Sequence, residues 1–232
     1  MKRPSKAIRQ LALALTVLSL AYVPGCSPRM DPDPQQHLRF QNFSALLPQG
    51  GGKWILNQST STETKKGVVV RVSFKKHLED HVIVASITEA PFTAYLDVPE
   101  GYSPSEREEI TLSQRQRLVL EDLKASLQED VETVPGELVS SIFETDASPE
   151  LACQRHYVTH DSTTIIEGVH TTARLWVRGI SCFPPDLRVL AELTYVKAVK
   201  TDTVKMGNRE EGDEFINEAE TFFRSLDWGV RE

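Results

Sequence analysis

The chain has 232 residues, a formal net charge of −7 and only three cysteines. A chain of this length can bury a sizeable core and suits a single domain. The net negative charge argues against nucleic acid or an anionic membrane surface as a partner.

The N-terminal segment has the layout of an export signal. Four basic residues and no acidic residue precede an apolar run from Leu11 to Val23; the bases are Lys2, Arg3, Lys6 and Arg9. A membrane-spanning helix needs about 20 apolar residues, so this run is too short to remain as an anchor. We therefore expect residues 1–25 to be removed as a signal peptide, which would make the mature chain more acidic.

The signal ends in Val23-Pro24-Gly25-Cys26, which resembles the lipobox of bacterial lipoproteins. In that family the signal is cut just before the cysteine, whose sulfur carries a diacylglyceryl group. The resemblance implies that Cys26 is the lipidated mature N-terminus. Val23 and Gly25 fit the motif, whereas Pro24 departs from its usual small or β-branched residue. The alternative is a cysteine that merely follows a secretory signal, although no A-x-A-like cleavage site precedes it.

The same resemblance implies a location in the bacterial cell envelope, with the acyl chains as the contact to the membrane. An Asp after the lipidated cysteine would favour inner-membrane retention, so Ser27 favours the outer membrane, facing the periplasm, in a host with two membranes. Residues 26–39 combine the lipidated cysteine with a tether that contains three prolines and few apolar residues. We expect one folded domain over residues 40–229.

The first part of this domain reads as strands. Phe43–Leu47 and Trp54–Leu56 flank the turn residues Pro48 to Gly52, which predicts an early hairpin. Val68–Phe74 alternates at its end and is followed, after a short polar loop, by His81–Ile87. This pattern predicts a second hairpin.

A helix follows these strands. Ser103-Pro104-Ser105-Glu106 offers an N-cap serine, a proline at the first helical position and a glutamate at N3. Leu120, Leu123 and Leu127 share one face of a helix. We expect a long central helix that continues to about Gln128.

The two remaining cysteines, Cys153 and Cys182, predict a disulfide because an exported pair is more often bridged than free. The numbers of opposed residues in an antiparallel pair have a constant sum, so opposing these cysteines places the turn between Glu167 and Gly168. A glycine suits that position, since two-residue hairpin turns favour positive φ. The alternative is two buried, reduced thiols.

The chain closes with a third strand and a helix. Val189–Val196 extends the hairpin into a meander, and the helix begins at about Glu214. Its wide apolar stripe predicts docking on the sheet of the same domain, with a partner protein as the alternative. The stripe consists of Phe215, Ile216, Ala219, Phe222, Phe223 and Leu226, and Trp228 is expected to close its end.

These elements define an α+β fold: an antiparallel sheet, built from a hairpin and a meander, packed against a long central helix and a C-terminal helix. The order of elements and the ending Phe222-Phe223-Arg224-Ser225-Leu226-Asp227-Trp228 resemble the Mog1/PsbP/DcrB-like α/β fold over roughly residues 40–229. The resemblance implies a protein that acts by binding partners. That group offers no shared catalytic set, so no catalytic residue is carried over.

Histidines are the candidates for metal or catalytic chemistry. His77 and His81 enclose Leu78-Glu79-Asp80, but a zincin needs H-E-x-x-H on a helix, and here a hairpin loop is expected. We therefore expect surface histidines, with a metal site at His77 and His81 as the weaker alternative.

The other candidates also favour structural roles. In the expected register, His156, His160 and His170 do not converge, and Asp161 beside His160 lacks a G-x-S-x-G elbow. Arg174, Trp176 and Arg178 share one strand face, which could bind an anion or an aromatic ligand. We favour a covered face that buries the tryptophan and pairs the arginines.

The sequence thus predicts a non-enzymatic, lipid-anchored envelope protein that binds envelope proteins or supports an assembly, with no cofactor and no nucleic acid. A solute- or metal-binding lipoprotein is the first alternative, and it would need a formed pocket with convergent polar groups. An envelope hydrolase is the second alternative.

Overall fold

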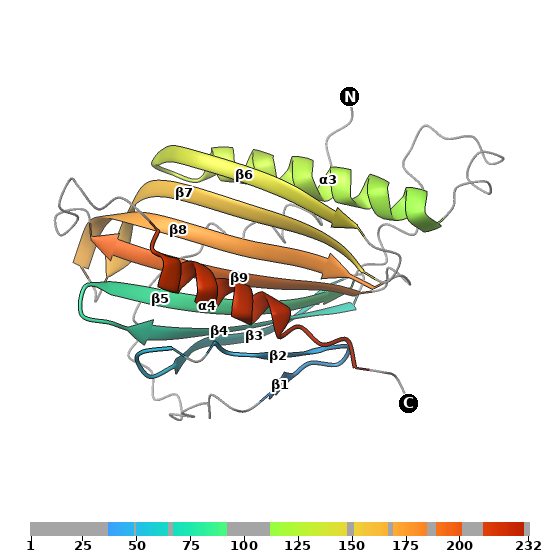
Figure 1. Ribbon diagram of the computed structural model, residues 1–232, viewed down its shortest axis with the longest axis horizontal. Helices are drawn as coiled ribbons and strands as arrows, with labels where there is room; N and C mark the ends of the chain where they lie inside the picture. Colours follow the sequence, from blue (N-terminus) through green and yellow to red (C-terminus); the bar gives the residue numbers. More distant parts are fainter. Residues whose placement is uncertain are drawn as a thin grey trace.

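The computed structural model describes residues 37–48, 50–64, 67–91, 112–147, 151–166, 169–184, 189–200 and 211–229. Within them, a seven-stranded antiparallel sheet in the order β3-β4-β5-β9-β8-β7-β6 is the main element (Figure 1). Its strands are β3 (Ile55–Thr64), β4 (Gly67–His77), β5 (His81–Pro91), β6 (Glu137–Ala147), β7 (Ala152–Ile166), β8 (Val169–Phe183) and β9 (Val189–Lys200). A small second sheet pairs β1 (His37–Arg39) with β2 (Ser44–Leu46).

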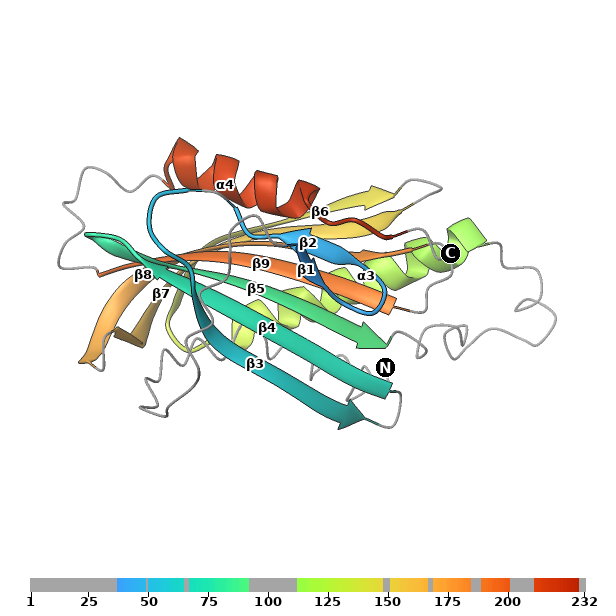
Figure 2. The ribbon, with the colours of Figure 1, turned by 90° about the horizontal axis from the view of Figure 1, so that it is seen from below.

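Helices lie on both faces of the large sheet (Figure 2). Helix α4 (Asp213–Arg224) and the β1–β2 hairpin cover one side, here called the α4 face. Helix α3 (Leu112–Thr133) packs on the other side, the α3 face, where it contacts β6 and β7. The α+β class and the antiparallel sheet are confirmed, whereas a central position for the long helix is not.

The stripe of α4 docks on the sheet of its own domain, as predicted. Phe215, Ala219, Phe222 and Phe223 are buried in one core cluster with residues of the sheet. Trp228 lies beyond the helix, with its ring centroid 5.4 Å from that of Phe43. No helix in the described ranges is both long and apolar enough to span a bilayer.

The two later predicted hairpins are present, and the β7–β8 hairpin has the expected register. β4 pairs with β5, and β7, β8 and β9 form a meander. Cys153 opposes Cys182, and His160 opposes Leu175. The turn residues 167–168 lie outside the described residues.

The early hairpin was predicted with the wrong partner. β2 pairs with β1 rather than with the strand after Trp54, and Ser44 also forms a bridge with Asp227 near the C-terminus. The residues from Pro48 to Gly52 therefore connect two different sheets. β1 lies inside the range 26–39 that was assigned to the tether, because Leu38 finds apolar cover against the core.

The helix and one edge strand also differ from the prediction. The cap at Ser103 lies outside the described residues, and α3 continues to Thr133, past the expected end at Gln128. Val131 explains the extension, because it adds a further buried contact with the sheet on the same helix face. Strand β6 was not predicted.

Candidate functional site

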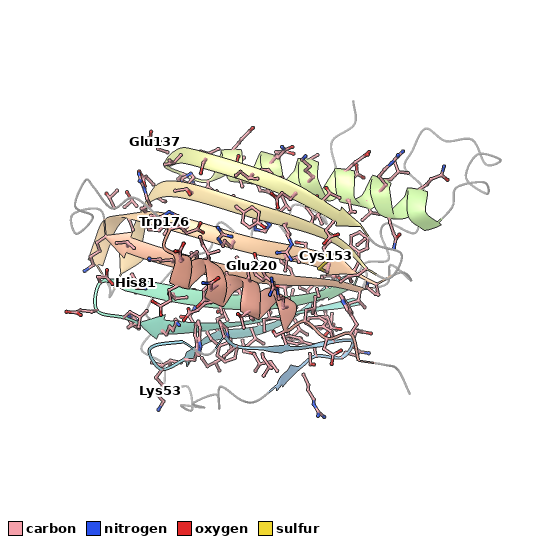
Figure 3. The ribbon with its side chains drawn as sticks, in the orientation of Figure 1. Lys53, His81, Glu137, Cys153, Trp176 and Glu220 are labelled. Carbon is pink, nitrogen blue, oxygen red and sulfur yellow. A yellow bond between two sulfur atoms is a disulfide. The ribbon has the colours of Figure 1, made fainter. Side chains whose placement is uncertain are left out.

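Cys26, the predicted lipidation site, lies outside the described residues. The predicted Cys153–Cys182 disulfide is present, with an S–S distance of 2.13 Å. Both sulfur-bearing residues are buried on the α4 face, in the core cluster beneath α4. Figure 3 shows Cys153 at the opposite end of the sheet from His81.

His77 and His81 do not converge on a common site. His77 pairs with Val82 at the end of β4, so its side chain points to the α3 face, whereas His81 points to the other face. His81 Nδ1 lies 2.5 Å from the exposed carboxylate of Asp80. In the parts of the chain that are described, no group of three or more His, Cys, Asp or Glu residues could hold a metal ion.

Among the described residues, the two buried histidines of the meander have no hydrogen-bonded acid that could orient them. His156 and His160 are buried on the α3 face, and His170 in β8 opposes Ile165 in β7. Asp161 points to the opposite face from His160, as successive strand residues do. Its carboxylate accepts hydrogen bonds from Arg174 at 2.7 and 2.6 Å. A catalytic pair of His160 and Asp161 is therefore absent.

The arginines of β8 have structural partners, as favoured from the sequence. Arg178 donates to Glu211 at 2.5 and 2.7 Å, and its guanidinium lies 4.7 Å from the ring centroid of Tyr157. Trp176 is buried in the core beneath α4, with the Lys197 ammonium 5.6 Å from its ring centroid. This strand face is covered and does not form an open anion site.

A layer of buried polar residues crosses the α3 face between two apolar clusters. Thr88, Glu192, Ser181 and Gln154 oppose one another across β5, β9, β8 and β7. We call the following set the polar band: Ser73, Thr88, Gln154, His156, Ser181 and Glu192. Gln154 is well satisfied, since it accepts from Thr145 and donates to the carbonyl oxygens of Glu144 and Arg155.

Two titratable groups of the polar band have strongly shifted pKa values. Burial raises the pKa of Glu192 to about 7, with Arg71 on β4 opposing the shift and Asp130 on α3 adding to it. Burial also lowers the pKa of His156 to about 4. The imidazole lies so close over Gly179 that a Cβ there would be 2.1 Å from it. Within the described residues, Glu192 Oε2 and both ring nitrogens of His156 lack a hydrogen-bond partner.

Replacing Glu192 by glutamine should stabilise the protein more at pH 8 than at pH 4. Because the pKa of Glu192 rises from 4.5 to about 7 on folding, wild-type stability falls as the pH increases through this window. Glutamine stays neutral at every pH and carries no such penalty. The variant's gain in unfolding free energy over the wild type should therefore be about 3 kcal/mol larger at pH 8 than at pH 4. Urea denaturation of both proteins at the two pH values measures this difference. His156 also titrates, but it is present in both proteins, so its contribution cancels in the comparison. A pH-independent difference would contradict the burial of a neutral Glu192.

A buried ion pair ties α4 to β4 on the other face. Lys76 has no exposed surface, and its Nζ lies 3.0 and 2.9 Å from the two carboxylate oxygens of Glu218. Tyr195 donates a hydrogen bond to the same carboxylate. Gly50 covers the pair so closely that a Cβ there would lie 1.4 Å from Glu218 Oε1. Lys76, Tyr195 and Glu218 satisfy one another within the protein, so this cluster stabilises the packing of α4 on the sheet.

A groove of about 760 Å³ opens between the β1–β2 hairpin and the ends of β4 and β5. Its walls are mostly apolar and include Leu38, Phe40, Val68, Val70 and Val72. Glu89 lies in the wall beside them and is only 6% exposed. Its carboxylate accepts hydrogen bonds from the Gln41 backbone N–H, at 2.9 Å, and from the Asn42 side-chain amide. The groove thus combines apolar walls with a buried acidic group.

The second open feature is β6, at one edge of the large sheet. Three of its apolar side chains face solvent: Leu138 is 38% exposed, Val139 46% and Ile142 55%. The register shifts between Leu138 and Ser140, which leaves Val139 outside the ladder with β7. Natural edge strands are usually short, charged or covered. A long edge strand with exposed apolar residues therefore marks a candidate interaction surface.

The sequence did not predict either the groove at Glu89 or the edge strand β6. The β-branched and aromatic residues Val139, Ile142 and Phe143, just after the turn signal Pro135-Gly136, are a strand signal that could have revealed β6, although the segment does not alternate strictly. Glu89 had no comparable signal, since a lone acid near the end of a strand is normally exposed. Its burial depends on the β1–β2 loop, whose donors are distant in sequence.

Comparisons of the chain with family models, with curated proteins and with solved structures gave no match. The likeness to the Mog1/PsbP/DcrB-like fold and to bacterial lipoproteins therefore stays a prediction.

Proposed function

We propose that this chain is a lipid-anchored protein of the bacterial cell envelope that binds an extended segment of a partner protein along β6. In this proposal Cys26 carries the acyl chains, the membrane contact is the anchor, and the domain performs no catalysis. In a host with two membranes, Ser27 favours the outer membrane as its location. The partner is another envelope protein.

The exposed apolar edge of β6 is the observation that carries the proposal. An extended peptide can add to such an edge through main-chain hydrogen bonds, while its side chains contact those of the edge strand. Ile142 is the best contact because it is 55% exposed and opposes Tyr157 in the neighbouring strand. The irregularity at Val139 interrupts the ladder, so we place the added strand along Ser140–Asp146.

Charge defines the chemistry of the partner segment. β6 contains Glu137, Glu144 and Asp146, all exposed, and no lysine or arginine. An added strand with basic residues between apolar ones would therefore gain complementary charge along this edge. We expect high salt to weaken such binding, because salt screens the attraction between exposed charges.

The proposal is tested by photo-crosslinking in intact cell envelopes. A benzoylphenylalanine at position 142 should capture an envelope protein, and mass mapping should place the crosslink in a segment with alternating basic and apolar residues. The matched control is the same residue at position 55, since Ile55 is also exposed, at 41%, but lies on the opposite edge strand. Charge reversal of Glu144 and Asp146 to lysine should abolish the adduct.

The same cells are used to test whether Cys26 carries a lipid anchor. Radiolabelled palmitate should enter the wild-type protein and not the Cys26→Ser variant, whose domain should leave the membrane fraction. Labelling that persists in Cys26→Ser contradicts the anchor. Equal crosslinking from positions 142 and 55, or none from position 142, contradicts partner binding at β6.

A further inference from the structure

The groove between the β1–β2 hairpin and the ends of β4 and β5 has the properties of a ligand site. Its volume of about 760 Å³ lies in the range of small-molecule pockets, which are typically about 300–1,000 Å³. Phe40, Val70 and Val72 supply apolar surface, and their side chains are only partly buried by the protein. A ligand with an apolar body would remove this surface from water.

Glu89 determines which polar group the ligand carries. The residue is only 6% exposed, and its carboxylate accepts hydrogen bonds from two neutral donors, the Gln41 backbone N–H and the Asn42 side-chain amide. None of the ion pairs among the described residues includes Glu89. A buried charge is normally paired with an opposite charge, and an ionised carboxylate accepts about four hydrogen bonds. Two acceptor positions thus remain for a cationic donor.

The surroundings of Glu89 supply no competing partner from the sheet. Its cross-strand neighbours on β4 and β9 are Val70 and Ala191. Arg39 also lines the groove, but its side chain is exposed, so water screens its charge. The low-polarity wall strengthens the attraction between the buried carboxylate and a cation brought into the groove.

From this geometry we infer that the groove binds a small amphiphile with an apolar chain or ring and a cationic amine head. The ammonium group donates to Glu89, and the apolar body lies along Phe40, Val70 and Val72. This site is separate from β6, since β4 and β5 lie at the other side of the sheet. Its existence therefore does not depend on partner binding or on lipidation.

The test uses calorimetric titration of the purified full chain with octylammonium, octanol and octanoate, each below its micelle threshold. Octylammonium should bind at least about tenfold more tightly than the other two, because only it forms a charge-assisted hydrogen bond. Glu89→Gln should remove that preference and leave the affinity for octanol unchanged. Val70→Ser should weaken binding of octylammonium and octanol together.

Two controls separate ligand recognition from a structural role of Glu89. Glu132→Gln makes the same change in net charge at an exposed position of α3, which packs on the opposite face, and it should leave all three affinities unchanged. Thermal unfolding monitors whether Glu89→Gln stays folded; the conservative Glu89→Asp variant, which keeps the charge, should retain a preference for octylammonium. Equal affinity of the wild-type chain for octylammonium and octanol, or a preference that survives Glu89→Gln, overturns the inference.

Discussion

Replacing Glu218 by alanine should destabilise the protein by about 3–5 kcal/mol, the usual cost of leaving one partner of a buried ion pair alone. The Lys76 ammonium is fully buried, 5.0 Å from the Trp54 ring centroid, and Glu218 is the acid that neutralises it. The substitution also removes the acceptor of the Tyr195 hydroxyl. Chemical denaturation, followed by the fluorescence of Trp54 and the other tryptophans, measures the loss.

The matched control lies two residues further along the same helix. Glu220 pairs with Arg155 at 2.9 Å, but both side chains keep about a quarter of their surface exposed, at 25% and 22%. Glu220→Ala should therefore cost only about 1 kcal/mol, as expected for a pair that water can screen. The double variant Lys76→Met/Glu218→Leu should recover most of the lost stability, since an apolar pair leaves no buried charge. Similar losses in Glu218→Ala and Glu220→Ala would contradict the buried-pair interpretation.

Removing the disulfide should lower the unfolding free energy by about 3–4 kcal/mol. Cys153 and Cys182 are separated by 29 residues, and a crosslink over such a loop restricts the unfolded chain by roughly this amount. The two cysteines already oppose each other in the β7–β8 ladder, so the folded hairpin retains its pairing without the bond. Adding a reductant to the wild-type protein should therefore lower the denaturation midpoint without abolishing the fold.

The double variant Cys153→Ala/Cys182→Ala provides the control, because a reductant should leave its midpoint unchanged. Mass mapping under non-reducing conditions should recover one crosslinked peptide from the mature wild-type protein. Free thiols at both positions, or an equal effect of the reductant on the double variant, would contradict a stabilising bridge.

The β7–β8 hairpin was predictable in register because its constraints are local. In the sequence, Gly168 predicts a turn, the flanking residues favour strands, and pairing the two cysteines fixes which residues face each other. The structure confirms the pairing of Cys153 with Cys182 and of His160 with Leu175. Helix α4 was predictable for a similar reason, since its apolar stripe repeats with the helical period and is buried as expected.

The early part of the domain was predicted less well, for a physical reason. The cluster of glycines after Pro48 signals a change of direction, but it carries no information about which strand lies next to β2. That choice depends on contacts with residues near the C-terminus, such as the backbone hydrogen bonds between Ser44 and Asp227. Local turn chemistry therefore gave the position of the break and the wrong partner for the strand.

The polar residues likewise depend on contacts that are distant in sequence. His77 and His81 looked like a possible ligand pair in sequence, and the alternation of the strands turns them to opposite faces. Nothing in the local sequence signals the burial of Glu89, Lys76 and Glu192, because lone charged residues in strands are normally exposed. Their burial results from elements far away along the chain: the β1–β2 loop over Glu89, α4 over Lys76 and the α3 layer over Glu192.

The sequence alone predicted the export signal with its Cys26 motif, which stays a prediction. It also predicted four features that the structure confirms: the β4–β5 hairpin, the β7–β8–β9 meander, the disulfide and the docked C-terminal helix. These depend on periodicity, turn residues and spacing, all of which act between near neighbours. The pairing of β5 with β9, which joins the two halves into one sheet, depends on packing between distant segments. The same long-range packing places the helices on opposite faces, buries Glu89 in a groove and leaves β6 as an open edge.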